Sequence, residues 1–302
     1  MAQCVAGEQY ESITGQLFEI GRQLRQRGGY PFDPEKLQKH LQKAIEGKFN
    51  AAPEAKRGEQ LIKASDQEGK EIIYDLEQIR DNWVDFYNDH NLSELAGALP
   101  KDVLLTAKQI EFLKEKTKEG FNRLILLPPL SIQKKNLGSI KNEMDKKVAG
   151  LSKDAQYTKT YLDDTVEPNF PDHLKSIHRP DRPYLLLIND TAEVDPGTLG
   201  KSADKLRKLF SENQFNGLTL AEYLIFQRDY TLRHQDDKNP HPNTMYWTWL
   251  LDDEIDESSK DYSGRVLRAY WYPGDRRVYV SSFSAGAGSS GRGARPSAIF
   301  EL

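Results

Sequence analysis

The segment RVLRAYWYPGDRRVYVSSF, residues 265–283, constrains the fold most strongly, because its side chains alternate in kind on both sides of a turn. Before the turn PGDR, Ala269 and Trp271 alternate with tyrosines. After the turn, Val278 and Val280 alternate with Tyr279 and Ser281. Successive side chains of a strand point to opposite faces, so this period predicts a β-hairpin with one face in the core and one face free.

The free face of this hairpin is a candidate binding surface. Tyrosine supplies large contact area at low entropic cost, and serine and glycine supply adaptable contacts, as in antibody-like surfaces. The predicted ligand-binding residues lie on the hairpin, its turn and the following loop: Tyr270, Tyr272, Asp275, Tyr279, Ser281, Phe283, Ser284, Ala285, Ser289, Ser290 and Arg292. We expect Trp247, Trp249 and Trp271 in the core. The alternative is a tyrosine-rich exposed strand without a ligand, because strands favour tyrosine in any case.

The loop GAGSSG, residues 286–291, matches the G-x-G-x-x-G pattern of dinucleotide-binding loops. That pattern binds pyrophosphate only where the glycines follow a strand and open a helix. Here Pro296 opposes a helix, and no ribose-binding acid follows in the sequence. We therefore expect no cofactor, and the glycines need another explanation.

Composition narrows the function classes. The chain has 302 residues, of which 29% are charged and 37% hydrophobic, and its net charge is −4. These values predict a soluble globular protein without a general affinity for nucleic acid. The apolar runs LILLPPL and YLLLI are too short to span a bilayer, and the N-terminus lacks the features of a signal peptide, so we expect a cytoplasmic protein. The only cysteine, Cys4, excludes intramolecular disulfides and cysteine-rich zinc sites.

The chain divides into two differently patterned halves. Apolar residues at helical spacing predict a helical hairpin over 10–47 and a third helix running through Ile72, Ile73, Leu76, Ile79, Trp83 and Phe86. Gly97 and Pro100 then indicate a domain boundary, which gives a helical region 1–97 and a second domain 100–302. The second domain mixes strands such as YLLLI with helices, one of which begins with a Thr219–Glu222 capping box. The fold class expected is α+β.

The C-terminal segments TWL, AYWYPGDRRVYV and GARPSAIF resemble the end of C-type-lectin-like domains. More narrowly, they and the segments GFNRLILLPPLS, RPYLLLINDT and GLTLAEYLIFQRDY are similar to variable proteins of diversity-generating retroelements. The resemblance covers residues 100–302. It implies a lectin-like scaffold with a small twisted antiparallel sheet, whose segment 265–293 is diversified to bind protein or other macromolecular ligands without a metal. The GAGSSG loop would then be one outcome of diversification.

Other motifs suggest alternatives. Glu167-Pro168-Asn169 and Asn189-Asp190 match the calcium and sugar motifs of mannose-type lectins, but a turn and a strand end explain them more simply. The acidic run 252–257 lacks an EF-hand register and indicates a solvated loop, so we expect no metal. Formylglycine-generating enzymes share the lectin-like fold, yet their chemistry needs paired cysteines, so that activity is not expected. No nucleophile or acid/base pair for another reaction is recognised in the sequence, so we expect no enzyme. The first alternative is a scaffold protein that assembles, as a homo-oligomer for example, through its N-terminal helices, and the second is an enzyme whose site the sequence does not reveal.

Overall fold

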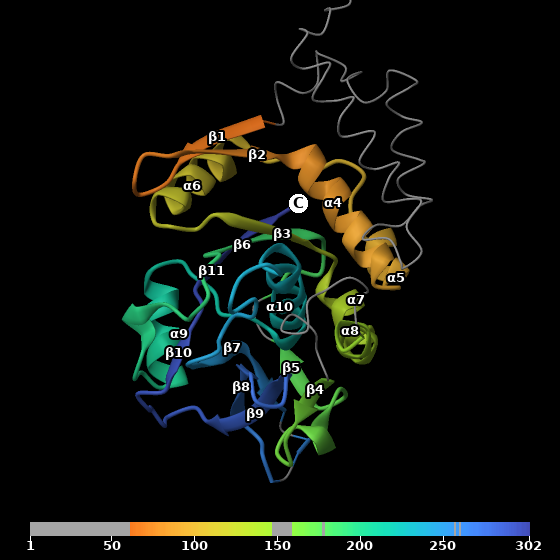
Figure 1. Ribbon diagram of the computed structural model, residues 1–302, viewed down its shortest axis with the longest axis vertical. Helices are drawn as coiled ribbons and strands as arrows, with labels where there is room; N and C mark the ends of the chain where they lie inside the picture. The colour runs from red at the N-terminus through yellow and green to blue at the C-terminus, as the bar shows by residue number, and fades with distance from the viewer. Residues whose placement is uncertain (1–60, 147–158, 177–178, 257, 260) are drawn as a thin grey trace, which may run out of the picture. The chain divides into compact units, whose positions relative to one another are not determined.

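The computed structural model describes residues 61–146, 159–176, 179–256, 258–259 and 261–302 (Figure 1). These described residues fall within one compact unit. This unit is a mixed α+β structure, as expected, and one of its sheets is curled. The helical hairpin expected over 10–47 lies outside the described residues. No helix among the described residues is both long and apolar enough to cross a membrane.

The first described elements are a β-hairpin followed by a helix. Strands β1 (Leu61–Ser65) and β2 (Glu71–Asp75) pair antiparallel, and Gly69 takes a positive φ of 81° in their turn. Helix α4 (Leu76–Asp89) begins only after Asp75, whose side chain accepts a hydrogen bond from the Gln78 backbone N–H. The helix expected from Ile72 onward is therefore wrong for its first turn. The cap at Asp75 decides where the strand ends and the helix begins.

The boundary expected between Gly97 and Pro100 falls inside a continuous core. Helix α4 packs on strand β3 (Arg123–Leu127), where the indole N–H of Trp83 donates to the Leu124 carbonyl at 3.1 Å. The Tyr87 hydroxyl likewise donates to the Leu126 carbonyl at 3.0 Å. Trp83 and Tyr87 belong to the same buried cluster as the C-terminal strands. Residues 61–97 thus pack as part of the second half, and α5 (Ser93–Gly97) is a short helix within it.

A three-stranded antiparallel sheet with the order β11-β6-β3 lies at the centre of this core. Its middle strand, β6 (Tyr184–Ile188), is buried at every position, as the run YLLLI predicts. Strand β11 (Ser297–Glu301) completes it. Helix α10 (Leu220–Arg233), which begins with the expected Thr219–Glu222 capping box, is buried from Leu220 to Thr231 and packs on α8 (Leu137–Met144).

The second sheet has six strands in the order β10-β7-β8-β9-β4, and β5 (Leu174–Ser176) pairs with β7. Its path runs from β10 (Arg292–Ala294) through β7 (Trp247–Ile255), β8 (Arg265–Tyr272) and β9 (Arg277–Ser284) to β4 (Lys159–Leu162). The expected hairpin is β8-β9. The two strands at the ends of this path pair in parallel, β10 with β7 and β4 with β9. The sheet is therefore mixed, whereas the resemblance implied an antiparallel one.

The two faces of the six-stranded sheet differ. One face, with Ala269, Trp271, Val278 and Val280, belongs to the main core. On the other face, α9 (Ala203–Glu212) covers Trp249 and forms a small second core. The rest of that face carries no helix among the described residues. The remaining short elements are α6 (Ala107–Lys118), α7 (Leu130–Lys135), η1 (Glu167–Asn169) and η2 (Pro196–Thr198).

Candidate ligand-binding face

A row of aromatic side chains crosses the open face of the six-stranded sheet. In the strand register, Tyr161 of β4 lies beside Tyr279 of β9, and Tyr279 lies opposite Tyr270 of β8. The ring centroids are 5.0 Å apart in the first pair and 5.5 Å apart in the second. Trp247 of β7 continues the row, 4.1 Å from Tyr270. We call Tyr161, Tyr279, Tyr270 and Trp247 the aromatic row.

This arrangement confirms the alternation expected from the sequence. Trp271 is 2% exposed and Ala269 is fully buried, whereas Tyr272 on the opposite face is 42% exposed. The ring of Tyr272 lies 6.1 Å from that of Tyr270 and 5.7 Å from that of Tyr279. Tyr272 therefore forms one contiguous surface with the aromatic row, which already contains two other predicted binding residues, Tyr270 and Tyr279.

The expectation that Trp247 lies in the core is wrong, while Trp249 and Trp271 are buried as expected. Trp247 and Trp249 share a face of β7, but α9 packs on Trp249 alone and leaves Trp247 partly exposed. The sequence reasoning also missed Tyr161. Its alternation with the buried Thr160 and Leu162 marks an outward position, yet nothing local indicates that β4 pairs with β9.

Arginines complete the surface. The guanidinium carbon of Arg268 lies 4.2 Å from the ring centroid of Trp247 and 4.8 Å from that of Phe283. Arg292, beside Trp247 in the β10-β7 register, lies 3.8 Å from the Phe283 centroid, and Arg277 lies 5.5 Å from the Tyr279 centroid. Cations over aromatic faces are attracted by the ring quadrupole. The aromatic face is hereafter the aromatic row together with Tyr272, Phe283, Arg268, Arg277 and Arg292.

Asp275 in the hairpin turn holds two groups of this face. It accepts a hydrogen bond from the Tyr279 hydroxyl at 2.8 Å and pairs with Arg277 at 2.9 Å. The hydrogen bond to Asp275, together with burial, raises the pKa of Tyr279. Tyr270 also has a raised pKa, because of its burial and the neighbouring Tyr272 and Asp275. Both phenols are therefore neutral at pH 7 and act as hydrogen-bonding aromatic groups.

Ser281 lies on the predicted face of the hairpin but is not exposed to a ligand. It points to the open face, as the alternation requires, but it is only 6% exposed because Arg268 covers it. The Arg268 Nη2 donates to its hydroxyl at 3.4 Å. Ser281 is therefore a support for Arg268 rather than a contact surface. A small side chain at this position leaves room for the guanidinium.

In the segment that ends β9 and follows it, some residue positions are exposed and others are closely packed. Ser284 and Ser290 are exposed, whereas Ala285 and Ser289 are partly buried. A Cβ added to Gly288 would lie 2.7 Å from the Gly200 carbonyl oxygen, but one added to Gly291 would meet no heavy atom within 4 Å. The loop leads into strand β10 and not into a helix. Close packing thus explains Gly288, one of the glycines that match the dinucleotide pattern.

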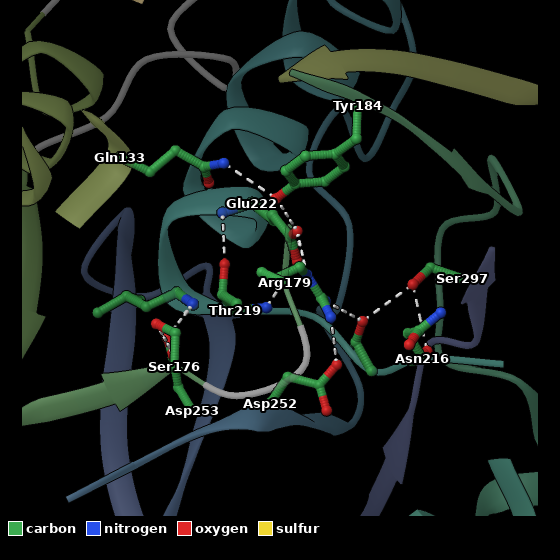
Figure 2. Close-up of polar contacts among 12 residues, drawn as sticks. Gln133, Ser176, Arg179, Tyr184, Asn216, Thr219, Glu222, Asp252, Asp253 and Ser297 are labelled. Atoms are coloured by element: carbon green, nitrogen blue, oxygen red, sulfur yellow. Dashed lines mark hydrogen bonds and ion pairs between the residues drawn. The ribbon is translucent and has the colours of Figure 1, made fainter. Parts of the chain in front are cut away.

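A second polar cluster is buried between β6, α10 and β7, and Figure 2 shows its contacts. The side chains of Arg179 and Glu222 are both 0% exposed and make two hydrogen bonds, at 2.6 and 2.8 Å. Arg179 also pairs with Asp252 at 2.5 Å, and Glu222 accepts a hydrogen bond from the Tyr184 hydroxyl at 2.6 Å. We call Arg179, Glu222, Asp252 and Tyr184, with the adjacent Asp253, the buried network.

The pKa values in the buried network follow from pairing. Burial alone would lower the pKa of Arg179, but Glu222 and Asp252 raise it well above its ordinary value. Burial alone would raise the pKa of Glu222, and the charge and hydrogen bonds of Arg179 lower it. Among the described residues, Asp253 pairs with no arginine and accepts hydrogen bonds from Ser176 and the Leu220 backbone N–H, so burial raises its pKa to about 7.

The acidic run 252–257 is therefore not a solvated loop at its start. Asp252 and Asp253 lie within β7, where the buried network uses them. Asp252 also forms part of the wall of a cavity of about 290 Å³, between α9 and β7, which Arg207 and Phe215 line as well. Each carboxylate is engaged from within the protein, which favours a structural role for the network.

The lectin-type calcium motifs do not come together as a site in the part of the chain that the structure describes. Asn169 donates its side-chain amide to the Thr165 carbonyl, and the Asp190 carboxylate pairs with Arg233. The described residues hold no group of three or more histidine, cysteine, aspartate or glutamate side chains suited to a metal ion.

In comparisons with known proteins, no family model, no curated protein and no solved structure matches the chain.

Proposed function

We propose that the protein is a metal-independent binding protein that recognises a protein or other macromolecular ligand through its aromatic face. The observation that carries the proposal is the aromatic row, four rings from four strands in register on the part of the sheet face that no described helix covers. Large aromatic side chains supply most of the energy at binding hot spots. The contiguous row has the composition of such a surface, since it offers apolar rings with phenol and indole hydrogen-bonding groups.

The surroundings of the row support a rigid binding platform. Behind it, Val278, Val280 and Trp271 are at most 2% exposed, so the hairpin is anchored in the main core. Asp275 restrains Tyr279 and Arg277 from the turn. Groups whose positions are set before binding lose less conformational entropy when a ligand arrives.

We further propose that the fold is a C-type-lectin-like scaffold and that segment 265–293 is its diversified part. The segment separates into positions where substitution is sterically free and positions where it is not. Side chains at Tyr270, Tyr272 and Ser290 reach the surface, while Val280 is buried and a Cβ added to Gly288 or Gly293 would lie 2.7 Å from a neighbouring heavy atom. This separation is the property that a diversified binding segment needs.

Two matched libraries of the full chain test the proposal. The first randomises five outward positions, Tyr270, Tyr272, Tyr279, Phe283 and Ser290. The control randomises five buried positions of the same hairpin, Val266, Ala269, Trp271, Val278 and Val280. Both libraries are displayed, sorted for protease-resistant clones and panned against unrelated proteins.

We expect most clones of the outward library to fold and to yield binders, because outward substitutions typically change stability by only about 0.5 kcal/mol each. The buried library should fold rarely, since large-to-small core changes cost about 2–5 kcal/mol. Equal loss of folding in the two libraries, or an outward library that folds but yields no binder, would contradict the proposed function.

A further inference from the structure

The aromatic face holds two arginines that lack a counter-ion. In the described parts of the chain, no carboxylate oxygen lies within 4.0 Å of Arg268 or Arg292, whereas Arg277 on the same face pairs with Asp275. The one hydrogen bond that either guanidinium makes to described residues is the 3.4 Å contact from Arg268 to Ser281. The Arg268 Nε and Arg292 Nη1 atoms are buried without a hydrogen-bond partner in the described residues, and the remaining free N–H donors of the two groups are available to a ligand.

The ring of Phe283 brings these two cations together. Arg268 lies 4.8 Å and Arg292 lies 3.8 Å from its centroid. Two like charges placed this close repel each other, and burial together with the charge of Arg292 lowers the pKa of Arg268 to about 10, although Asp163 acts in the opposite direction. An anion placed beside both guanidinium groups would relieve this repulsion and satisfy their donors.

We propose that Arg268 and Arg292, on either side of Phe283, form an anion subsite of the aromatic face that binds a carboxylate of an acidic protein segment. The inference rests on the proposed function, because it names the chemistry of the ligand for the same face. Guanidinium groups match carboxylates geometrically through paired N–H donors. The adjacent aromatic row would contact the apolar parts and backbone of the same segment.

The charge of the protein favours an isolated carboxylate over a polyanion. The net charge of the chain is −4, so the positive character of this face is local. A nucleic acid needs many phosphate contacts over an extended basic surface, and an acidic chain repels it. A protein segment with one or two carboxylates needs only the two arginines.

Nuclear magnetic resonance of the full-length protein tests the subsite through the side-chain Nε–Hε signals of its arginines, assigned with R268Q and R292Q. The probes are a short capped Gly/Ser peptide containing glutamates, the same peptide with glutamines in their place, and inorganic phosphate, all at constant ionic strength. The control variant K205Q/K208Q removes the same charge as R268Q/R292Q from exposed positions of helix α9 that lie outside the aromatic face.

We expect the glutamate peptide alone to shift both signals in a saturable way. Its affinity should fall at least about tenfold in R268Q/R292Q, the loss expected for charge-assisted hydrogen bonds, and by less than about twofold in K205Q/K208Q. If the double variant unfolds, R292Q alone decides by the same criterion, with a fall of at least about threefold.

Three results would overturn the inference: no saturable shift with the glutamate peptide, equal losses in the two double variants, or tighter binding of phosphate than of the peptide. These outcomes are separate from the proposed function. Suppose that the outward library folds and yields binders, but the Arg268 and Arg292 signals do not shift with the glutamate peptide. The anion subsite would then be wrong, and the proposed binding function of the aromatic face would stand.

Discussion

The aromatic face and the buried network use the same side chain, arginine, in opposite ways. Arg179 in the network is fully buried and pairs with Glu222 and Asp252. Arg268 on the face lies over the rings of Trp247 and Phe283 and has no carboxylate within 4.0 Å among the described residues. A buried cation needs paired anions, because isolated burial of a charge costs several kcal/mol. A half-exposed cation can instead stay hydrated and rest on aromatic rings. The difference separates an arginine that holds the fold from one that is open to a ligand.

The strongest test of this comparison is to remove each arginine in turn. Arg179→Met leaves Glu222 and Asp252 buried without their cation, and we expect the free energy of unfolding to fall by about 3–5 kcal/mol. Arg268→Met removes ring contacts, the long hydrogen bond to Ser281 and a partly desolvated charge, so its effect should stay within about 1 kcal/mol. Urea denaturation measures both values. Similar losses in the two variants would show that the face is as structural as the network.

The pH dependence of stability sharpens the account of the network. The pKa of Asp253 is about 7 in the folded protein, against an ordinary value of 3.8, so the folded state keeps a proton that the unfolded chain has released. Its contribution to stability is complete below pH 3.8 and is lost as the pH rises through 7.

Between pH 5 and 8, the free energy of unfolding of the wild type should fall by about 3 kcal/mol relative to Asp253→Asn, which cannot titrate. Glu222 has a lowered pKa, so it titrates below this window. Thermal melts at a series of pH values, compared between the two proteins, measure the difference. Parallel pH profiles would mean that Asp253 is ionised in the folded state.

The smallest expected effect concerns the loop beside the face. Gly288→Ala would place a methyl group 2.7 Å from the Gly200 carbonyl oxygen, and we expect a loss of about 1–3 kcal/mol. Gly291→Ala meets nothing within 4 Å and should change stability by less than about 0.5 kcal/mol. Denaturation of both variants checks the pair. A tolerated Gly288→Ala would extend the freely variable part of the loop to that position.

Local signals were enough for much of this molecule. The period of two around PGDR predicts the β8-β9 hairpin and the burial of Trp271 and Val280, because a strand's pleat alone sends alternate side chains to opposite faces. The Thr219–Glu222 capping box predicts where α10 begins, because its hydrogen bonds span only three residues. The strand at YLLLI follows in the same way from a short apolar run.

Tertiary structure decided what these elements became. Tyr161 joins the aromatic row only because β4 pairs in parallel with β9, far along the chain, and no local pattern specifies that partner. Trp247 is open while Trp249 is buried, because α9 covers one and not the other. The local sequence is enough to predict that Glu222 caps helix α10. Its ion pair with Arg179 forms only because α10 packs against the segment before β6. Sequence determines which face a side chain takes along its own strand or helix, whereas burial and charge pairing depend on the segments that folding brings alongside.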